Sequence, residues 1–269
     1  MRTPTHTTAQ RTQAVIVAAL ALGLFIALTP GGLLDKADMI GYAVCHRIPS
    51  HSFFIAGRQL PLCARCSGTF LGALVGLFGQ AVVLKRRRAS SFPPPPILAL
   101  MAAFLILWGG DGVNSYLTMT LGHPFLYPPQ QWLRLTTGTL AGVTLSAVLW
   151  PTLNFSLCLE PLSEPAVRNG RDLAVLLAMA GGAALLVWSR WPPLLYPLAI
   201  LSALGVLAML TGVNTVIVAM ALGWENRYRR CREAMVPLLL GFTLSLLVIG
   251  GIDLLRYAVT GTLGGFPGL

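Results

Sequence analysis

The sequence predicts an all-α protein, a polytopic bundle of about seven helices that crosses a membrane. Of its 269 residues, 55% are hydrophobic and only 10% are charged, and the mean hydropathy is +0.72. Soluble globular domains carry about 25% charged residues, so this composition calls for lipid as the surrounding solvent. The apolar residues are also gathered into runs with the length of membrane-spanning helices.

Seven apolar runs are each near the ~20 residues that a helix needs to cross the hydrocarbon core. The expected spans lie near residues 14–33, 67–84, 97–119, 135–155, 173–189, 194–223 and 236–256. The first run has a basic start, but ALTPGGLLDK after it is a poor signal-peptidase site, so we expect an uncleaved helix. The proline-rich segment 89–96 predicts a stiff spacer before the third span.

The Lys and Arg residues predict the orientation. Most of the 19 lie in clusters that seven crossings place on one side of the membrane. The clusters are Arg2 with Arg11, the KRRR segment 85–88, Arg168 with Arg171, and the RYRRCR segment 227–232. We expect the chain to lie in the cytoplasmic membrane. The positive-inside rule then places its N-terminus in the cytoplasm. The loop of residues 34–66 falls on the extracytoplasmic side.

The chain divides into three sections around this topology. Residues 1–13 are a cytoplasmic tail, residues 14–157 are a membrane domain with the 34–66 loop, and residues 158–269 carry about three further spans. A net charge of +10 would suggest nucleic acid as the partner of a soluble protein. Here the basic residues are topology signals, and no segment can host a nucleic-acid-binding domain, so the expected partner is the lipid bilayer.

The 34–66 loop concentrates residues that ligate metals. Cys63 and Cys66 form a C-x-x-C pair, Cys45 lies earlier in the loop, and His46 follows it directly. Three thiolates and one imidazole are the ligand set of a closed tetrahedral zinc site. We therefore predict a zinc site at Cys45, His46, Cys63 and Cys66. His51 is a rival fourth ligand, because adjacent residues rarely ligate one ion together.

Other uses of these thiols stay open. An iron–sulfur cluster is less favoured because clusters usually take four thiolates, and a c-type haem is disfavoured because Ser67 rather than His follows Cys66. Cys63 and Cys66 could instead be a redox pair with Cys45 as exchange partner, or a structural disulfide beside a free thiol. Arg47 and Arg65 would favour thiolates in either case.

The remaining cysteines are Cys158 and Cys231. Both fall at the expected cytoplasmic ends of helices, far from the 34–66 loop. We expect them to take no part in the site.

The segments CHRIPSHSF and LCARCSGTFLG resemble the signature of a family of prokaryotic membrane proteins catalogued only as a domain of unknown function. That signature runs Cys-His, Ser-Phe, then Pro-x-Cys-x-Arg-Cys-[Ser/Thr]-Gly. The matching residues are Cys45, His46, Ser52, Phe53, Pro61, Cys63, Arg65, Cys66, Ser67 and Gly68. The family's second block, Asp-Gly followed by Leu-Arg-x-x-Thr-Gly, is similar to Asp111-Gly112 and 133–138. The resemblance covers residues 40–150 and implies no established activity. His51 stands where many relatives carry Arg, which weakens it as a ligand.

The second block places charges inside the membrane. Asp111 lies about 21 Å along its helix from the cytoplasmic start, at about 1.5 Å per residue, and so level with the 34–66 loop. A carboxylate at that depth needs a partner and indicates a functional site. We expect Arg134, at the outer start of the next span, to be that partner, in a pair that is either structural or functional. Asp111, Arg134 and Arg65 are the candidate catalytic residues.

Two further patterns concern helix packing and the last span. Gly68, Gly72 and Gly76 on the second span, with Gly138 and Gly142 on the fourth, predict that these two helices pack closely. That contact would bring Cys66 near Arg134. Asp253 and Arg256, at i and i+3, are expected as a solvated pair at the membrane interface.

Three classes of function remain, and the sequence does not decide whether the protein is an enzyme. The first is a binding or scaffold protein whose zinc site folds the 34–66 loop. The second is an enzyme that exchanges disulfides with a membrane or periplasmic partner, or that hydrolyses a lipid-linked substrate. The third is a transporter or a subunit of a membrane assembly, which is the weakest because few polar residues lie deep in the spans.

Overall fold

The computed structural model describes residues 6–228 and 233–262. Its helices are α1 (Thr8–Leu28), α2 (Leu33–Val44), α3 (Ala64–Phe78), α4 (Pro95–Leu121), α5 (Gln131–Leu157), α6 (Gly170–Ser189), α7 (Leu195–Ala221) and α8 (Met235–Thr260). Short 3-10 helices η1 (Pro49–His51) and η3 (Pro192–Leu194) and a π-helical end of α3, η2 (Gly79–Val83), accompany them. The strands are β1 (Ser52–Ile55), β2 (Arg58–Cys63), β3 (Ala89–Ser91) and β4 (Leu162–Pro165).

Seven of the described helices are long and apolar enough to cross a membrane, which confirms the predicted all-α polytopic bundle. They follow the seven apolar runs in order, with ends that differ by a few residues. The largest shift is at α1, which begins at Thr8 rather than near residue 14. Thr7 and Gln10 form a capping box there, and this polar first turn extends the helix beyond its apolar part.

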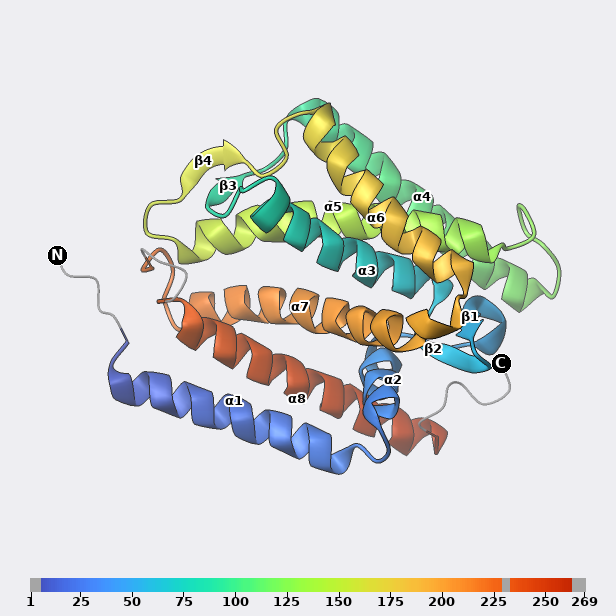
Figure 1. Cartoon of the computed structure of the whole chain (residues 1–269), viewed down its shortest axis with the longest axis horizontal. Helices are drawn as coiled ribbons and strands as arrows, with labels where there is room; N and C mark the ends of the chain where they lie inside the picture. Colours follow the sequence, from blue (N-terminus) through green and yellow to red (C-terminus); the bar gives the residue numbers. More distant parts are fainter. Residues whose placement is uncertain (1–5, 229–232, 263–269) are drawn as a thin grey trace.

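The spans run between two ends of the bundle (Figure 1). The first end, here called the Cys end, holds α2, the β1–β2 hairpin and the start of α3. The opposite end, here called the basic end, holds β3, β4 and the start of α1. Every predicted basic cluster that the structure describes lies at the basic end; Arg2, Arg229, Arg230 and Arg232 lie outside the described residues. This common placement is the one that the positive-inside rule requires.

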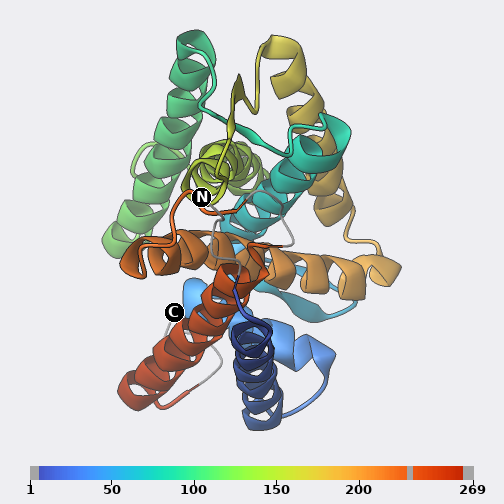
Figure 2. The same cartoon turned by 90° about the vertical axis from the view of Figure 1, so that its left-hand side faces the viewer.

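Helices α3 and α5 form the tightest helix pair, as their glycines predict. A Cβ atom on Gly138 would meet the backbone oxygen of Arg65, and one on Gly142 would meet the oxygen of Thr69. A Cβ atom on Gly72 would lie 2.6 Å from the oxygen of Thr139. The backbones therefore touch without room for side chains, which is the use of small residues between helices in lipid. Figure 2 shows α5 in the interior, viewed along its axis.

The 34–66 segment was expected to be a loop and is instead largely structured. The amphipathic helix α2 buries Leu34, Ala37 and Ile40. At 12 residues it is about 18 Å long, too short to cross the hydrocarbon core. Strands β1 and β2 then form an antiparallel hairpin. Because α2 is shorter than a membrane-spanning helix, apolar runs of about 20 residues do not predict it.

Ion pairs fix this segment to itself. Asp38 lies 3.0 Å from an Arg47 nitrogen and 2.9 Å from an Arg58 nitrogen, and Arg58 also reaches Asp35 at 2.6 Å. Because Asp35 and Asp38 belong to α2, Arg58 to β2 and Arg47 to the chain between them, the contacts clamp the hairpin onto the helix. The cysteines at the edges of both elements are held in place by this clamp.

Candidate metal centre

Three cysteines meet at the point where α2, β2 and α3 join. Cys45 follows α2 directly, Cys63 ends β2 and caps α3, and Cys66 lies in the first turn of α3. Their Sγ atoms all lie within 4.8 Å of one another. Cys45 and Cys63 are buried, and none of the three forms a disulfide. The structure thus brings together the three thiols that the sequence predicted as ligands.

The sulfur of Cys45 is surrounded by hydrogen-bond donors of the protein. It accepts hydrogen bonds from the backbone N–H groups of Cys63, at 3.2 Å, and Arg47, at 3.4 Å. Hydrogen bonds from the thiols of Cys63 and Cys66 hold the pKa of Cys45 well below its usual range. The bond to Cys45 in turn raises the pKa of Cys63 to about 12.

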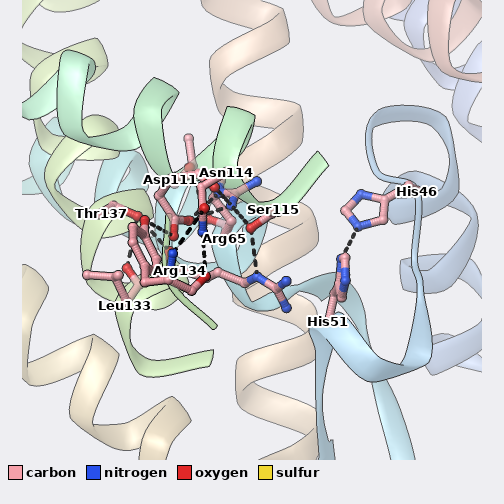
Figure 3. A network of polar contacts seen from close by, with 11 residues as sticks. His46, His51, Arg65, Asp111, Asn114, Ser115, Leu133, Arg134 and Thr137 are labelled. Carbon is pink, nitrogen blue, oxygen red and sulfur yellow. Dashed lines mark hydrogen bonds and ion pairs between the residues drawn. The ribbon is translucent and has the colours of Figure 1, made fainter. Parts of the chain in front are cut away.

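His46 lies next to this cluster, and His51 lies against His46 (Figure 3). His46 places Nδ1 4.0 Å from the sulfur of Cys45, and its Nε2 lies 3.1 Å from Nδ1 of His51. His46 is not within the mutual 4.8 Å of the three sulfurs, so its role as fourth ligand stays a prediction. Burial, with the positive charge of Arg134, lowers the pKa of His51 to about 4, so that ring is neutral near pH 7.

The partner of Asp111 is Arg65, not Arg134. Arg65 donates from Nε to Oδ2 of Asp111 at 3.1 Å, forms an ion pair through Nη2, and also donates to the Asp111 backbone oxygen at 2.9 Å. The hydroxyl of Tyr127 donates to Oδ1 at 3.0 Å. Both carboxylate oxygens are therefore used. Since Arg65 stands between Cys63 and Cys66, this pair ties the C-x-x-C turn to α4.

Arg134 lies beside this pair without an ion-pair contact to Asp111 in the described chain. Its Nε donates to Oγ of Ser115 at 3.3 Å, and Ser115 also accepts from Arg65 at 2.9 Å. The predicted Asp111–Arg134 pair is thus wrong as a direct contact. The physical reason is that Arg65 and Tyr127 already satisfy the carboxylate, so Arg134 shares a hydroxyl with Arg65 instead.

Two residues of this network were missed by sequence reasoning. Tyr127 belongs to the turn between α4 and α5, and Ser115 is one turn of helix beyond Asp111. Asn114 is the sequence feature that could have pointed to Tyr127. Its side chain accepts from the N–H of Leu126 at 2.9 Å and donates to the backbone oxygen of Tyr127 at 3.0 Å. A buried amide near a helix end often holds a loop, and here it brings Tyr127 to Asp111.

Arg256 supports the cysteine cluster from α8. Its Nη1 donates to the backbone oxygen of Cys45 at 2.8 Å, and its guanidinium lies 3.9 Å from the ring centre of Tyr42. Asp253 was expected to form a solvated pair with it. Instead Asp253 is buried, and neither of its carboxylate oxygens accepts a hydrogen bond in the described structure. The i, i+3 spacing did not predict this because Arg256 turns toward the Cys45 carbonyl.

The cysteine Cys158 lies at the basic end, where its N–H donates to Asn154. It is therefore separated from the cluster by the length of the bundle, as expected. Cys231 lies outside the described residues.

Comparison with known proteins supports the family resemblance. Residues 45–148 match the model of the family described as "Predicted membrane protein (DUF2085)". The match begins at Cys45 and includes Cys63, Cys66, Asp111 and Arg134, so it confirms the resemblance to an uncharacterised family of membrane proteins.

One relative is an uncharacterized protein, MJ1492, from Methanocaldococcus jannaschii. It is 43% identical over 42 residues, which are 16% of this chain and 27% of the relative. The similarity thus spans about a quarter of that protein's length. No solved structure matches the chain.

Proposed function

We propose that this protein binds one zinc ion through Cys45, Cys63 and Cys66 at the Cys end of the bundle, on the extracytoplasmic face of the cell membrane. The observation that carries the proposal is the meeting of three sulfurs within 4.8 Å. Zinc–sulfur bonds of about 2.3 Å place the sulfurs of a tetrahedral site about 3.8 Å apart. The cluster therefore suits a tetrahedral ion with small adjustments of side chains.

His46 is the fourth ligand in this proposal. Its Nδ1 faces Cys45, while its Nε2 is engaged by His51 at 3.1 Å. Ligating histidines ordinarily use their second nitrogen in such a hydrogen bond, which fixes the orientation of the ring. His51 then acts as a positioning residue, in agreement with its neutral ring near pH 7. When bound, zinc would supply a structural cross-link between α2 and α3.

The proposed side of the membrane rests on charge. The described Lys and Arg clusters lie at the end opposite the cysteines, and such clusters remain in the cytoplasm during insertion. Cysteine labelling of intact cells with a membrane-impermeant maleimide tests the orientation. A cysteine introduced by His123→Cys, in the turn after α4, should react, whereas one introduced by Arg87→Cys, at the basic end, should not.

Cobalt substitution tests the metal site. Co²⁺ bound by thiolates in tetrahedral geometry gives sulfur-to-metal charge-transfer bands and intense visible bands. We expect both in the wild type and in Cys158→Ser, and their loss in Cys45→Ser and Cys63→Ser. A His46→Ala variant that keeps the charge-transfer bands but changes the visible bands supports His46 as fourth ligand. Identical spectra in all variants would refute the site.

A second function, thiol–disulfide exchange, is favoured by one observation. Cys63 and Cys66 form a C-x-x-C pair whose sulfurs lie within 4.8 Å of each other without a disulfide. In this reaction the two thiols would form a disulfide, with their two electrons and two protons passing to a partner disulfide or a quinone. The burial of Cys63, 2% exposed, opposes it, because exchange needs access to the sulfur. Anaerobic thiol counts before and after addition of a soluble quinone separate the two functions.

A further inference from the structure

A cavity of about 320 Å³ lies beside the cysteine cluster, between α4 and the segment that precedes β1. Its lining includes His46, His51, Arg65, Gly112 and Ser115. One wall is therefore cationic and polar. The lining also includes Tyr116 and Met119 of α4, which are 63% and 39% exposed. In a membrane their exposed surface faces lipid.

Two arginines lie at this cavity: Arg65 lines it, and Arg134 lies beside it. Asp111 is occupied by Arg65 and Tyr127, as described above. Arg134 is only 4% exposed, and among the described residues its terminal nitrogens have neither a hydrogen-bond partner nor a carboxylate within ion-pair distance. Figure 3 shows Arg134 reaching past Ser115 toward His51, both of which line the cavity. Guanidinium nitrogens without a hydrogen-bond partner can donate to the oxygens of an anion that enters here.

The remaining donors of Arg65 point to the same place. Its Nε and Nη2 bind Asp111 and Ser115, while Nη1 has no hydrogen-bond partner in the described chain. A Cβ atom on Gly112 would lie 3.6 Å from this Nη1, and Gly112 lines the cavity. Arg65 and Arg134 thus offer unused guanidinium nitrogens from two different helices. Paired guanidinium groups are well suited to the oxygens of a phosphate.

We infer that this cavity is a binding site for a phosphate group, held by Arg134, Arg65 and Ser115. Its volume lies at the low end of ligand sites, which suits a head group rather than a whole lipid. The exposed wall of Tyr116 and Met119 would let an acyl or polyprenyl chain continue from the phosphate into the bilayer. The inference stands on Arg134 and the cavity, and it does not require zinc at the cysteines.

Thermal unfolding in dodecyl maltoside tests the inference with three added probes: phosphatidic acid, diacylglycerol with the same chains, and inorganic phosphate. A ligand that binds only the folded state raises Tm with its concentration. We expect phosphatidic acid to raise the Tm of the wild type and diacylglycerol to leave it unchanged. An equal rise with inorganic phosphate would identify the source as the free anion, whereas a rise with phosphatidic acid alone would identify a lipid phosphate.

Variants test whether the rise in Tm comes from binding in this cavity. Arg134→Gln and the cavity-filling Met119→Trp, at a partly exposed position, should both lose the rise in Tm. Arg190→Gln, which removes an exposed charge at the same end, should keep it. If phosphatidic acid and phosphate leave the wild type unchanged, or if Met119→Trp responds like the wild type, the inference is overturned. A zinc content that falls in Arg134→Gln without any phosphate effect on the wild type would instead make Arg134 a counter-ion of the thiolates.

Discussion

The Cys end and the basic end each hold an ion pair between an arginine and a carboxylate, but the two pairs differ in burial. At the Cys end Arg65 and Asp111 form a buried pair, with side chains 16% and 1% exposed. At the basic end the pair of Arg168 and Glu164 is 40% and 47% exposed. Exposed pairs contribute little to stability, whereas breaking a buried pair leaves an uncompensated charge. The comparison teaches that the ion pair beside the cysteines is held inside the protein, whereas the pair at the basic end lies at its surface.

The cysteines give the largest expected contrast between the two ends. Cys45→Ser and Cys63→Ser should lose bound zinc and about 3 kcal/mol or more of stability, because metal binding free energy is folding free energy. Cys158→Ser, at the basic end, should change neither quantity. Zinc content and thermal unfolding of the purified variants measure both effects. Equal behaviour of the three variants would remove the distinction between the ends.

The buried ion pair gives the next effect. Asp111→Asn should cost about 3–5 kcal/mol, because it leaves Arg65 buried without its counter-charge. Glu164→Gln, in the exposed pair, should cost less than about 0.5 kcal/mol. Thermal unfolding in detergent compares them.

A second substitution sharpens the assignment of the partner. Arg65→Gln should recover part of the loss in Asp111→Asn, since it removes the stranded charge, and Arg134→Gln should recover less. Greater recovery with Arg134→Gln would contradict the Arg65–Asp111 pair.

The helix contact beneath the site gives a smaller effect. Gly142→Ala should destabilise the protein by about 1–3 kcal/mol, because its Cβ atom would meet the Thr69 backbone oxygen. Gly181→Ala on α6 is the matched control, since nothing lies within 4 Å of its added Cβ atom. Chemical or thermal unfolding of both variants decides the matter. A neutral Gly142→Ala would mean that α3 and α5 are not in backbone contact.

Asp253 gives the smallest effect and a change of opposite sign. Its carboxylate oxygens accept no hydrogen bond in the described structure, so Asp253→Asn should stabilise the protein by about 1 kcal/mol without altering zinc content. The Tm of the variant is compared with that of the wild type. A fall in Tm on this substitution would show that the carboxylate has a favourable partner.

The fold was predictable because its signals are lengths and compositions. Seven apolar runs of membrane-spanning length became seven long helices. The glycines that predicted contact between the second and fourth spans lie where α3 and α5 touch. The three predicted cysteine ligands also met, since the C-x-x-C turn adjoins the start of a helix and Cys45 follows a helix packed against the same hairpin.

The contacts inside the site were not predictable from spacing. Depth along a helix placed Asp111 level with the cysteines, but the choice between Arg65 and Arg134 depends on helix rotation and on the turn that carries Tyr127. Likewise, the i, i+3 spacing of Asp253 and Arg256 allowed a pair, and the backbone oxygen of Cys45 competed for the arginine. The spacing of residues in a sequence does not reveal how a helix is rotated or which backbone carbonyl groups compete for an arginine.

The most direct test of the central claim is the zinc content of detergent-purified wild-type protein kept anaerobic, with a parallel count of reactive thiols. The account predicts about one zinc per chain, with the thiols of Cys45, Cys63 and Cys66 protected until a chelator removes the metal. Protein without metal, whose thiols cycle between reduced and oxidised forms, would contradict the zinc site and place thiol–disulfide exchange first.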